Sequence, residues 1–189
     1  MPIIHSLFYS FKPSLINSSR NSISFNSKGW DPHFAPDTEL HESDVVNIGF
    51  VINVIEDAAE RADALRRAFS LSRRVLSIAV MLDSGNRTGL PFSDGLLTTR
   101  NTFQKYFTQS EFKEYIEHAL EREAHMVAPG VAFVFADFDA EQRFTANSLL
   151  PIAKESGIAS NTVRWRDLYL HLHLSILPPL RAIYLPALP

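Results

Sequence analysis

The chain has 189 residues, 46% of them hydrophobic and 21% charged, which is ordinary usage for a folded domain and excludes wholesale disorder or a fibrous repeat. Its 18 basic and 21 acidic residues give a formal net charge of -3, which supplies no broad basic surface for nucleic acid. The absence of cysteine excludes disulfides, cysteine zinc sites and thiol nucleophiles. No apolar run reaches the roughly 18 residues of a membrane span, so we expect a cytoplasmic protein that does not enter a membrane.

Composition divides the chain into three parts. Residues 1–28 form a Ser/Asn-rich N-terminal segment, and 12–28 is predicted to be loop because short polar side chains compete for the backbone's hydrogen bonds. The segment lacks the basic leading region and the small-residue cleavage site of a secretory signal. Residues 29–140 carry the patterns of a folded domain, and residues 141–189 form a less defined C-terminal segment.

The most regular pattern predicts a strand, a helix and a second strand in succession. Residues 45–52 and 75–82 are apolar and rich in β-branched side chains, as in strands that are buried on both faces of a sheet. Between them, Asp57 followed by Glu60 resembles a capping box, and the arginines at 73–74 would close the helix where its dipole favours cations. Because the three elements have the size of one βαβ unit, we expect the two strands to be parallel.

Charge spacing predicts the exposed face of this helix. Asp57 and Arg61 are four residues apart, and so are Asp63 and Arg67. Opposite charges at this spacing stabilise an exposed helix face by a few tenths of a kcal/mol. We therefore expect Arg61 and Arg67 on the solvent side of the helix.

The next stretch reads as a long loop followed by a helix and a strand. Residues 83–100 hold the turn signals Ser-Gly-Asn, Gly-Leu-Pro and Asp-Gly, and a loop of this length after a buried strand is more often functional than idle. Thr108 and Glu111 form a second capping box, which predicts another helix. Residues 131–135 predict a third buried strand, so the fold class is α/β.

Ligand-binding positions follow from the expected sheet. In an open parallel sheet, ligands bind beyond the carboxyl ends of the strands. This rule selects residues 50–57 and the loop at 83–100, where Asn53, Glu56 and Asp57 are the polar groups best placed to face a ligand. The alternatives are that Asn53 braces a turn and that Asp57 serves as the helix cap.

Polar groups elsewhere favour structural roles. His171 and His173 share a face if their segment is a strand, but no nearby carboxylate supports a metal site. His118 and His125 are seven residues apart on the second predicted helix, where solvent exposure explains both. We therefore expect no metal. The arginines of 164–166 flank a tryptophan and could stack on a nucleobase, although a surface turn is favoured.

Three strings of residues resemble a known family. They are Gly-Trp-Asp-Pro at 29–32, the stretch 44–57 followed by Ala-Glu-Arg at 59–61, and Thr-Phe-Gln-Lys-Tyr-Phe-Thr at 102–108. Together they resemble the methyltransferases associated with DNA phosphorothioation, over residues 29–137. The resemblance implies a class I enzyme dependent on S-adenosylmethionine, with a Rossmann-like, doubly wound sheet. It also implies a bacterial DNA-sulfur-modification setting, in which DNA or DNA-modification proteins are the expected partners.

The same resemblance assigns roles to residues. Asp31 takes the place of the acidic residue that ends the second strand and binds the cofactor ribose. Residues 44–52 take the place of the fourth strand, which brings Phe50 and Asn53 to the methionine end of the cofactor. Asn53 and Tyr106 are candidates for positioning a methyl acceptor, and no residue is assigned as a catalytic base.

The chain departs from the family before Gly29. Family members resemble other class I enzymes in having a first strand and a Gly-rich loop there, whereas this chain has no glycine before Gly29. Glycine is needed in such a loop because side chains would block the approach of backbone N–H groups to the cofactor. We therefore expect a partial sheet without its first strand and Gly-rich loop. Two hypotheses follow: a methyltransferase, or a catalytically inactive fragment or interaction protein of the same system.

Overall fold

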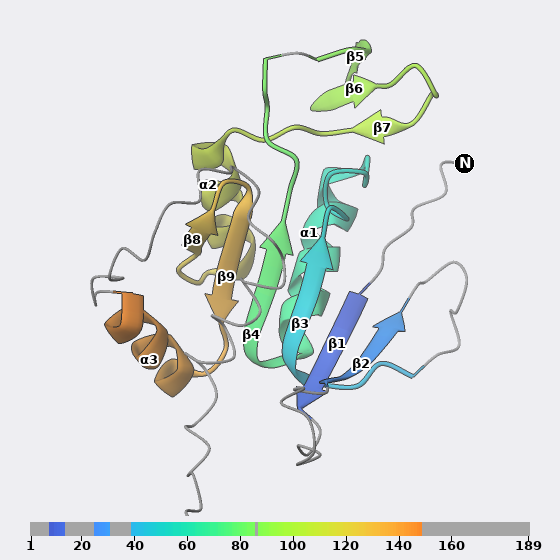
Figure 1. Cartoon of the computed structure of the whole chain (residues 1–189). Coiled ribbons are helices and arrows are strands. Elements are labelled where there is room, and N and C mark those ends of the chain that lie inside the picture. The colour runs from blue at the N-terminus through green and yellow to red at the C-terminus, as the bar shows by residue number, and fades with distance from the viewer. Residues whose placement is uncertain (1–7, 14–24, 31–38, 86, 149–189) are drawn as a thin grey trace, which may run out of the picture. The chain divides into compact units, whose positions relative to one another are not determined.

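The computed structural model describes residues 8–13, 25–30, 39–85 and 87–148 (Figure 1). The chain forms two compact units, Met1–Asp137 and Phe138–Pro189. The first unit is a mixed α/β domain. The described part of the second unit is the helix α3 (Phe138–Ser148).

A six-stranded sheet forms the centre of the first unit, with the strand order β2-β1-β3-β4-β9-β8. Strands β3 and β4 are parallel, whereas β1 is antiparallel to both β2 and β3, and β9 is antiparallel to both β4 and β8. Hence β2, β3, β4 and β8 run in one direction, and β1 and β9 run in the other. The strands are β1 (Phe8–Pro13), β2 (Phe25–Trp30), β3 (Ser43–Gly49), β4 (Ser72–Ala79), β8 (His125–Ala128) and β9 (Val131–Phe135).

The predicted βαβ unit is confirmed as β3, the helix α1 (Ala58–Ser70) and β4. Both strands lie two to three residues earlier in the chain than predicted, and β4 ends at Ala79 rather than at residue 82. Strand β3 ends at Gly49 rather than at residue 52, because Phe50 takes a left-handed backbone with φ 61°. The arginines at 73–74 do not close the helix, because α1 ends at Ser70 and both lie in β4.

The N-terminal segment contributes two strands: β1 lies mostly ahead of the loop predicted at 12–28, whereas β2 begins inside it and corrects that prediction. Strand β1 pairs with β3 from Phe8 opposite Ile48 to Phe11 opposite Val45. It therefore occupies the position beside β3 that the expected partial sheet would leave open. Polar composition hid β2, since a β ladder is formed by backbone groups that every residue except proline can supply in full.

Asp57 caps α1, as predicted. Its side-chain Oδ1 accepts hydrogen bonds from the backbone N–H groups of Ala59 and Glu60, both at 2.8 Å. We expect Asp57→Ala to lower the free energy of unfolding by about 1 kcal/mol, because two N–H groups of the first turn lose their acceptor. Urea denaturation measures this loss. Asp57→Ser is the control, since serine is also a good cap, and an equal loss in both variants would contradict the capping role.

A small second sheet interrupts the predicted loop at 83–100. It consists of β5 (Leu90–Phe92), β6 (Gly95–Leu97) and β7 (Phe103–Gln104), paired antiparallel in that order. We call this element, residues 90–104, the ribbon. Strands this short carry too few residues for an alternating pattern to be visible in the sequence. A side chain at Gly95 would place its Cβ 2.6 Å from the carbonyl oxygen of Gln104, which explains glycine at the turn.

The helices α1 and α2 (Gln109–Leu120) share one hydrophobic core with the central strands (Figure 1). The predicted capping box of α2 is confirmed, with Thr108 and Glu111 each bonding the other's backbone. Among the described residues, none of the helices has both the length and the apolar character that crossing a membrane requires. The largest fully buried apolar side chains of the first unit include Ile48, Ile52, Leu65, Leu76, Ile78, Phe103, Phe107, Phe112, Ile116 and Phe133.

Candidate functional site

The carboxyl ends of β3 and β4 point toward the ribbon (Figure 1). The chain leaves β3 through residues 50–57, which lead into α1, and leaves β4 through residues 80–89, which lead into the ribbon. This edge of the sheet is where the parallel pair places a ligand site. The segments that the sequence selected therefore do lie at one edge.

Phe50 begins the segment after β3 in an uncommon conformation. Its φ of 61° is in the left-handed region, which is strained for a bulky side chain. The backbone N–H of Phe50 donates a hydrogen bond to the carbonyl of Ala79 at 2.8 Å, and the next residues, Val51 and Ile52, are buried. Those contacts hold the turn, while the Phe50 side chain stays 47% exposed at the edge of the sheet. Its predicted contact with a cofactor stays a prediction.

Asn53 is fully buried and joins three segments of backbone. Its Oδ1 accepts a hydrogen bond from the N–H of Met81 at 3.0 Å, and its Nδ2 donates to the carbonyl of Lys105 at 2.6 Å. The N–H of Lys105 in turn donates to the carbonyl of Asn53 at 2.7 Å. Asn53 thus braces the turn after β3 against the ends of β4 and the ribbon. A role toward a cofactor or acceptor remains a prediction.

Arg61 does not lie on the solvent face of α1 with Asp57, as the charge spacing predicted. Its side chain is 1% exposed and reaches the tip of the ribbon. There NH1 and NH2 donate to the two carboxylate oxygens of Asp94 at 2.7 and 3.1 Å. Toward the sheet, Nε and NH2 donate to the carbonyl of Ile55 at 3.1 and 2.9 Å, and NH2 donates to that of Glu56 at 3.3 Å.

Lys105 extends this cluster toward α2. Its Nζ lies 3.2 Å from Oδ2 of Asp94 and donates a hydrogen bond to Oε1 of Glu111 at 2.8 Å. Two cations and two carboxylates therefore form a charge-balanced group, which we call the charged network: Arg61, Asp94, Lys105 and Glu111. The hydrogen bond from Arg61 lowers the pKa of Asp94, against the opposing effect of burial. Sequence reasoning missed this network, because its members come from four separate segments.

Two aromatic rings complete the surroundings of the network. The Arg61 guanidinium lies 5.7 Å from the centre of the Phe103 ring, and Lys105 Nζ lies 4.8 Å from that of Phe107. Cations over aromatic faces gain more when they are removed from water, as both are here. The two cations of the network are therefore buried between α1, α2 and the ribbon, while its two carboxylates lie partly in water.

A second ion pair lies where the chain leaves β4. Asp83 pairs with Arg87, and its Oδ1 also accepts a hydrogen bond from the N–H of Gly85 at 2.9 Å. Its hydrogen bond with Arg87, followed by that from Gly85, lowers the pKa of Asp83 to about 2. The N–H of Asp83 donates to the carbonyl of Phe107 at 2.9 Å, which closes the base of the ribbon. Tyr106, the other candidate for positioning an acceptor, is half-buried beside this base.

Several sequence candidates lie outside the described residues. Asp31 is one of them, although β2 ends at Trp30 and runs parallel to β3. The histidines at 171 and 173 and the arginines of 164–166 are the others. Their predicted roles stay predictions.

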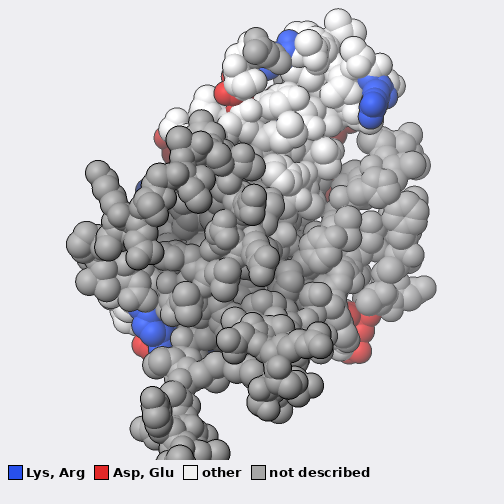
Figure 2. Space-filling view, viewed as in Figure 1, with Lys and Arg blue, Asp and Glu red and all other residues white. Residues whose placement is uncertain are grey.

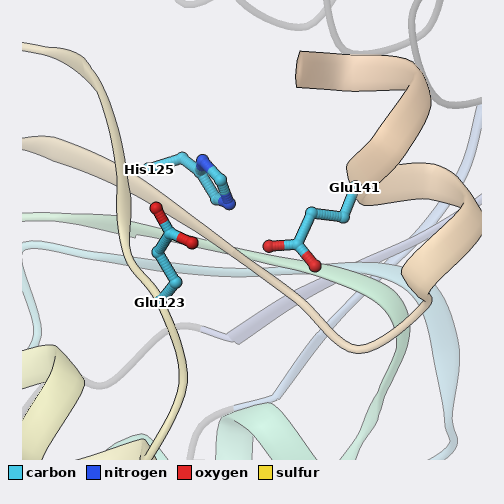
Figure 3. Close-up of side chains that lie close together, drawn as sticks. All are labelled: Glu123, His125 and Glu141. Carbon is cyan, nitrogen blue, oxygen red and sulfur yellow. The ribbon is translucent and has the colours of Figure 1, made fainter. Parts of the chain in front are cut away.

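The prediction for His118 and His125 is wrong in one respect, because the two do not share a helix. Helix α2 ends before Glu121, which takes the left-handed cap conformation, and His125 begins β8. The ring of His125 packs edge-on against Phe135 at 5.4 Å. Figure 3 draws His125 and Glu123 beside β8. Its third residue, Glu141, belongs to the second unit, so we assign the three no joint role.

The visible face of the ribbon carries mainly uncharged side chains (Figure 2). Leu90 is 73% exposed and Phe92 is 40% exposed, while Leu96 and Phe103 are buried beneath. Pro91, between the two exposed residues of β5, has no N–H to offer a further strand. The ribbon thus exposes two large apolar side chains on β5, a strand whose outer edge is protected by proline.

Comparison with known proteins gives no match to this chain, whether with family models, curated proteins or solved structures. What the chain does therefore has to be argued from its own residues and strands.

Proposed function

We propose that this chain is a cytoplasmic methyltransferase of class I, dependent on S-adenosylmethionine and associated with bacterial DNA phosphorothioation. The resemblance of residues 29–32, 44–57 and 102–108 to that family supports the proposal. DNA or a DNA-modification protein is the proposed partner, and the methyl acceptor is left open.

The order and directions of the strands are the observation that carries the proposal. Across a class I methyltransferase sheet, the second, first, fourth, fifth, seventh and sixth strands are neighbours, and the seventh runs opposite to the others. The order β2-β1-β3-β4-β9-β8 resembles this order from the second strand to the sixth, and β9 is reversed as the seventh strand is, but β1 is reversed as well. The match agrees with the roles that the resemblance gave to β3 and β4 as fourth and fifth strands.

Strand β1 is the departure from this pattern. It runs antiparallel to β3, whereas a class I first strand is parallel to the fourth. Its direction also removes the geometry in which a Gly-rich loop would leave the first strand at the ligand edge. Of the predicted cofactor contacts, Asn53 already uses its amide to brace backbone, and Phe50 offers an exposed ring. The described residues fit the cofactor only in part, so we derive no catalytic step through it.

The second candidate function is an interaction protein of the same modification system, without catalysis. The reversed β1 and the absence of glycine before Gly29 favour it. Both candidates share the sheet, and they differ in whether the chain binds the cofactor.

Thermal unfolding with and without excess S-adenosylhomocysteine separates the two functions. At a ligand concentration of about 100 dissociation constants, binding should add about 2.7 kcal/mol, which raises the melting temperature by several degrees. A cooperative transition that shifts upward supports the methyltransferase. A cooperative transition that does not move rejects cofactor binding and leaves the interaction protein.

We expect Asp31→Ala to abolish the shift caused by S-adenosylhomocysteine, because the carboxylate would accept hydrogen bonds from the ribose hydroxyls. Calorimetric titration of the variant measures the loss as a dissociation constant. Asp63→Ala is the matched control, since Asp63 lies on the exposed face of α1 and pairs with Arg66 at 2.7 Å. An unchanged dissociation constant in Asp31→Ala would remove Asp31 from the site.

A further inference from the structure

The charged network joins the ribbon to the turn that leads into α1. Asp94 is carried by the two-residue turn between β5 and β6, where Phe92 pairs with Gly95. The guanidinium of Arg61 donates hydrogen bonds to that carboxylate on one side and to the carbonyls of Ile55 and Glu56 on the other. The guanidinium is thus the link between the ribbon tip and the segment that carries Phe50 and Asn53.

The base of the ribbon is fixed in a different way. There the backbone of Phe107 donates to the carbonyl of Met81 at 3.2 Å and accepts from the N–H of Asp83 at 2.9 Å. The hydrogen bonds between Lys105 and Asn53 add to this attachment. These are backbone and buried amide bonds, which do not depend on Asp94. The ribbon therefore has a permanent base, and its tip is attached through the Asp94 carboxylate and through one hydrogen bond from Lys105 Nζ to the Asp94 carbonyl at 3.3 Å.

Of the two attachments of the ribbon, at its base and at its tip, the one at the tip is the weaker. The Asp94 side chain is 39% exposed, so water can compete for its hydrogen bonds with Arg61 and Lys105. Among the described ribbon residues, buried apolar contacts are few, with Leu96 and Phe103 as the buried hydrophobic side chains. An element with few such contacts and a solvent-facing attachment opens at a lower free energy than the core it lies on.

We propose that the ribbon is a flap over the carboxyl ends of β3 and β4, and that the Asp94–Arg61 ion pair is the latch that holds it closed and couples it to the turn after β3. Release of the latch lets the ribbon swing on its base at Asp83 and Phe107 and exposes this edge of the sheet. It also removes from Arg61 the partner that keeps it aligned with the carbonyls of Ile55 and Glu56. The proposed flap and latch do not require methyl transfer, because they are inferred from contacts within this chain alone.

Hydrogen exchange of the full chain tests the latch, with Asp94→Asn compared to Asp63→Asn. Asparagine keeps the size of the side chain and removes the charge that both cations share. We expect amides of residues 95–104 and of 53–57 to exchange about tenfold to a hundredfold faster in Asp94→Asn, while those of β4 keep their protection. Asp63→Asn, which breaks an exposed pair on α1, leaves all three regions unchanged.

Two outcomes would overturn the latch: no acceleration of the ribbon, or equal acceleration of the ribbon and β4, which would make Asp94 a general stabiliser. If Asp94→Asn does not fold, Asp94→Glu replaces it, because it keeps the charge and displaces the tip by one methylene. The exchange rates of the ribbon and of β4 are then compared in the same way, and the same two outcomes would overturn the latch.

The absence of cysteine allows a second, direct measurement of flap position. Spin labels on Leu90→Cys and Glu60→Cys report the distance between the ribbon and the start of α1, because both side chains are exposed and the chain has no other thiol. We expect a narrow distance distribution with Asp94 present and a broader, longer one with Asp94→Asn. An identical distribution in the two proteins would reject the flap, whatever S-adenosylhomocysteine does to the melting temperature.

Discussion

Arg61→Met should lower the free energy of unfolding by about 3 kcal/mol, one of the two largest losses that we expect from a single substitution in this chain. Methionine replaces the apolar stem of the arginine but none of its donors. The carbonyl of Ile55 loses two hydrogen bonds, and the carboxylate of Asp94 loses two. The carbonyl of Ile55 loses its two bonds in a buried place, which is why the cost exceeds that of an exposed ion pair, whereas Asp94 is 39% exposed and keeps Lys105 at 3.2 Å. Urea denaturation followed by circular dichroism measures it.

Arg66→Met is the matched control on the same helix. Arg66 also pairs with an aspartate, Asp63 at 2.7 Å, and donates to the carbonyl of Ala119 at 3.2 Å, but its side chain is 54% exposed. We expect a loss below about 1 kcal/mol, because water replaces the lost partner. Equal losses in the two variants would contradict a special cost of the buried guanidinium.

A double variant isolates the pair itself. If Arg61 and Asp94 stabilise the chain through each other, Arg61→Met combined with Asp94→Leu should lose less than the sum of the two single losses. Lys105 keeps Glu111 as a partner at 2.8 Å in that variant, so it is not left without a carboxylate. Strict additivity would show that the two residues act independently.

The elements that sequence reasoning predicted are those specified by neighbours in the chain. The βαβ unit and the caps at Asp57 and Thr108 all follow from residues a few positions apart, and the structure has each of them. Local spacing fails for Arg61, whose partner Asp94 is 33 positions away. The charge at Asp57 suggested a pair within the helix, but the ribbon covers that part of α1 and offers a bidentate carboxylate instead.

In the candidate site, too, the features set by neighbours in the chain were predicted, and those set by distant residues were not. The rule for parallel strands located the edge correctly, because strand direction was set by the βαβ unit. What each side chain does there depends on contacts that the rule does not contain. Asn53 is buried because Met81 and Lys105, 28 and 52 positions away, supply the groups that its amide binds. Phe50 is turned outward by a left-handed backbone that no residue pattern indicated.

Asn53 and Asp94 both connect the ribbon to the turn after β3, at the carboxyl edge of the sheet. One amide ties the turn after β3 to the base of the ribbon, and one ion pair ties the same turn to the ribbon tip. The turn is therefore held by the ribbon at both ends, through Asn53 and through Ile55. Any ligand that enters at this edge meets a surface whose shape depends on where the ribbon lies.

Asn53→Leu should cost about 2 to 3 kcal/mol of unfolding free energy, even without any ligand present. Leucine has the same number and branching of side-chain heavy atoms as asparagine, with bulkier methyl groups, so the loss does not come from a cavity. The N–H of Met81 loses its bond at 3.0 Å, and the carbonyl of Lys105 loses one at 2.6 Å. Urea denaturation of the ligand-free protein measures the change.

Asn47→Leu is the matched control, because it changes the same residue type in the same part of the sheet. The Oδ1 of Asn47 is buried without a hydrogen-bond partner in the described part of the chain. Removing it breaks no bond of that oxygen, so we expect a loss below about 1 kcal/mol. A small loss for Asn53→Leu, together with a lost response to S-adenosylhomocysteine, would instead make Asn53 a ligand-binding residue. A large loss in the ligand-free protein establishes the brace, because no ligand is present to account for it.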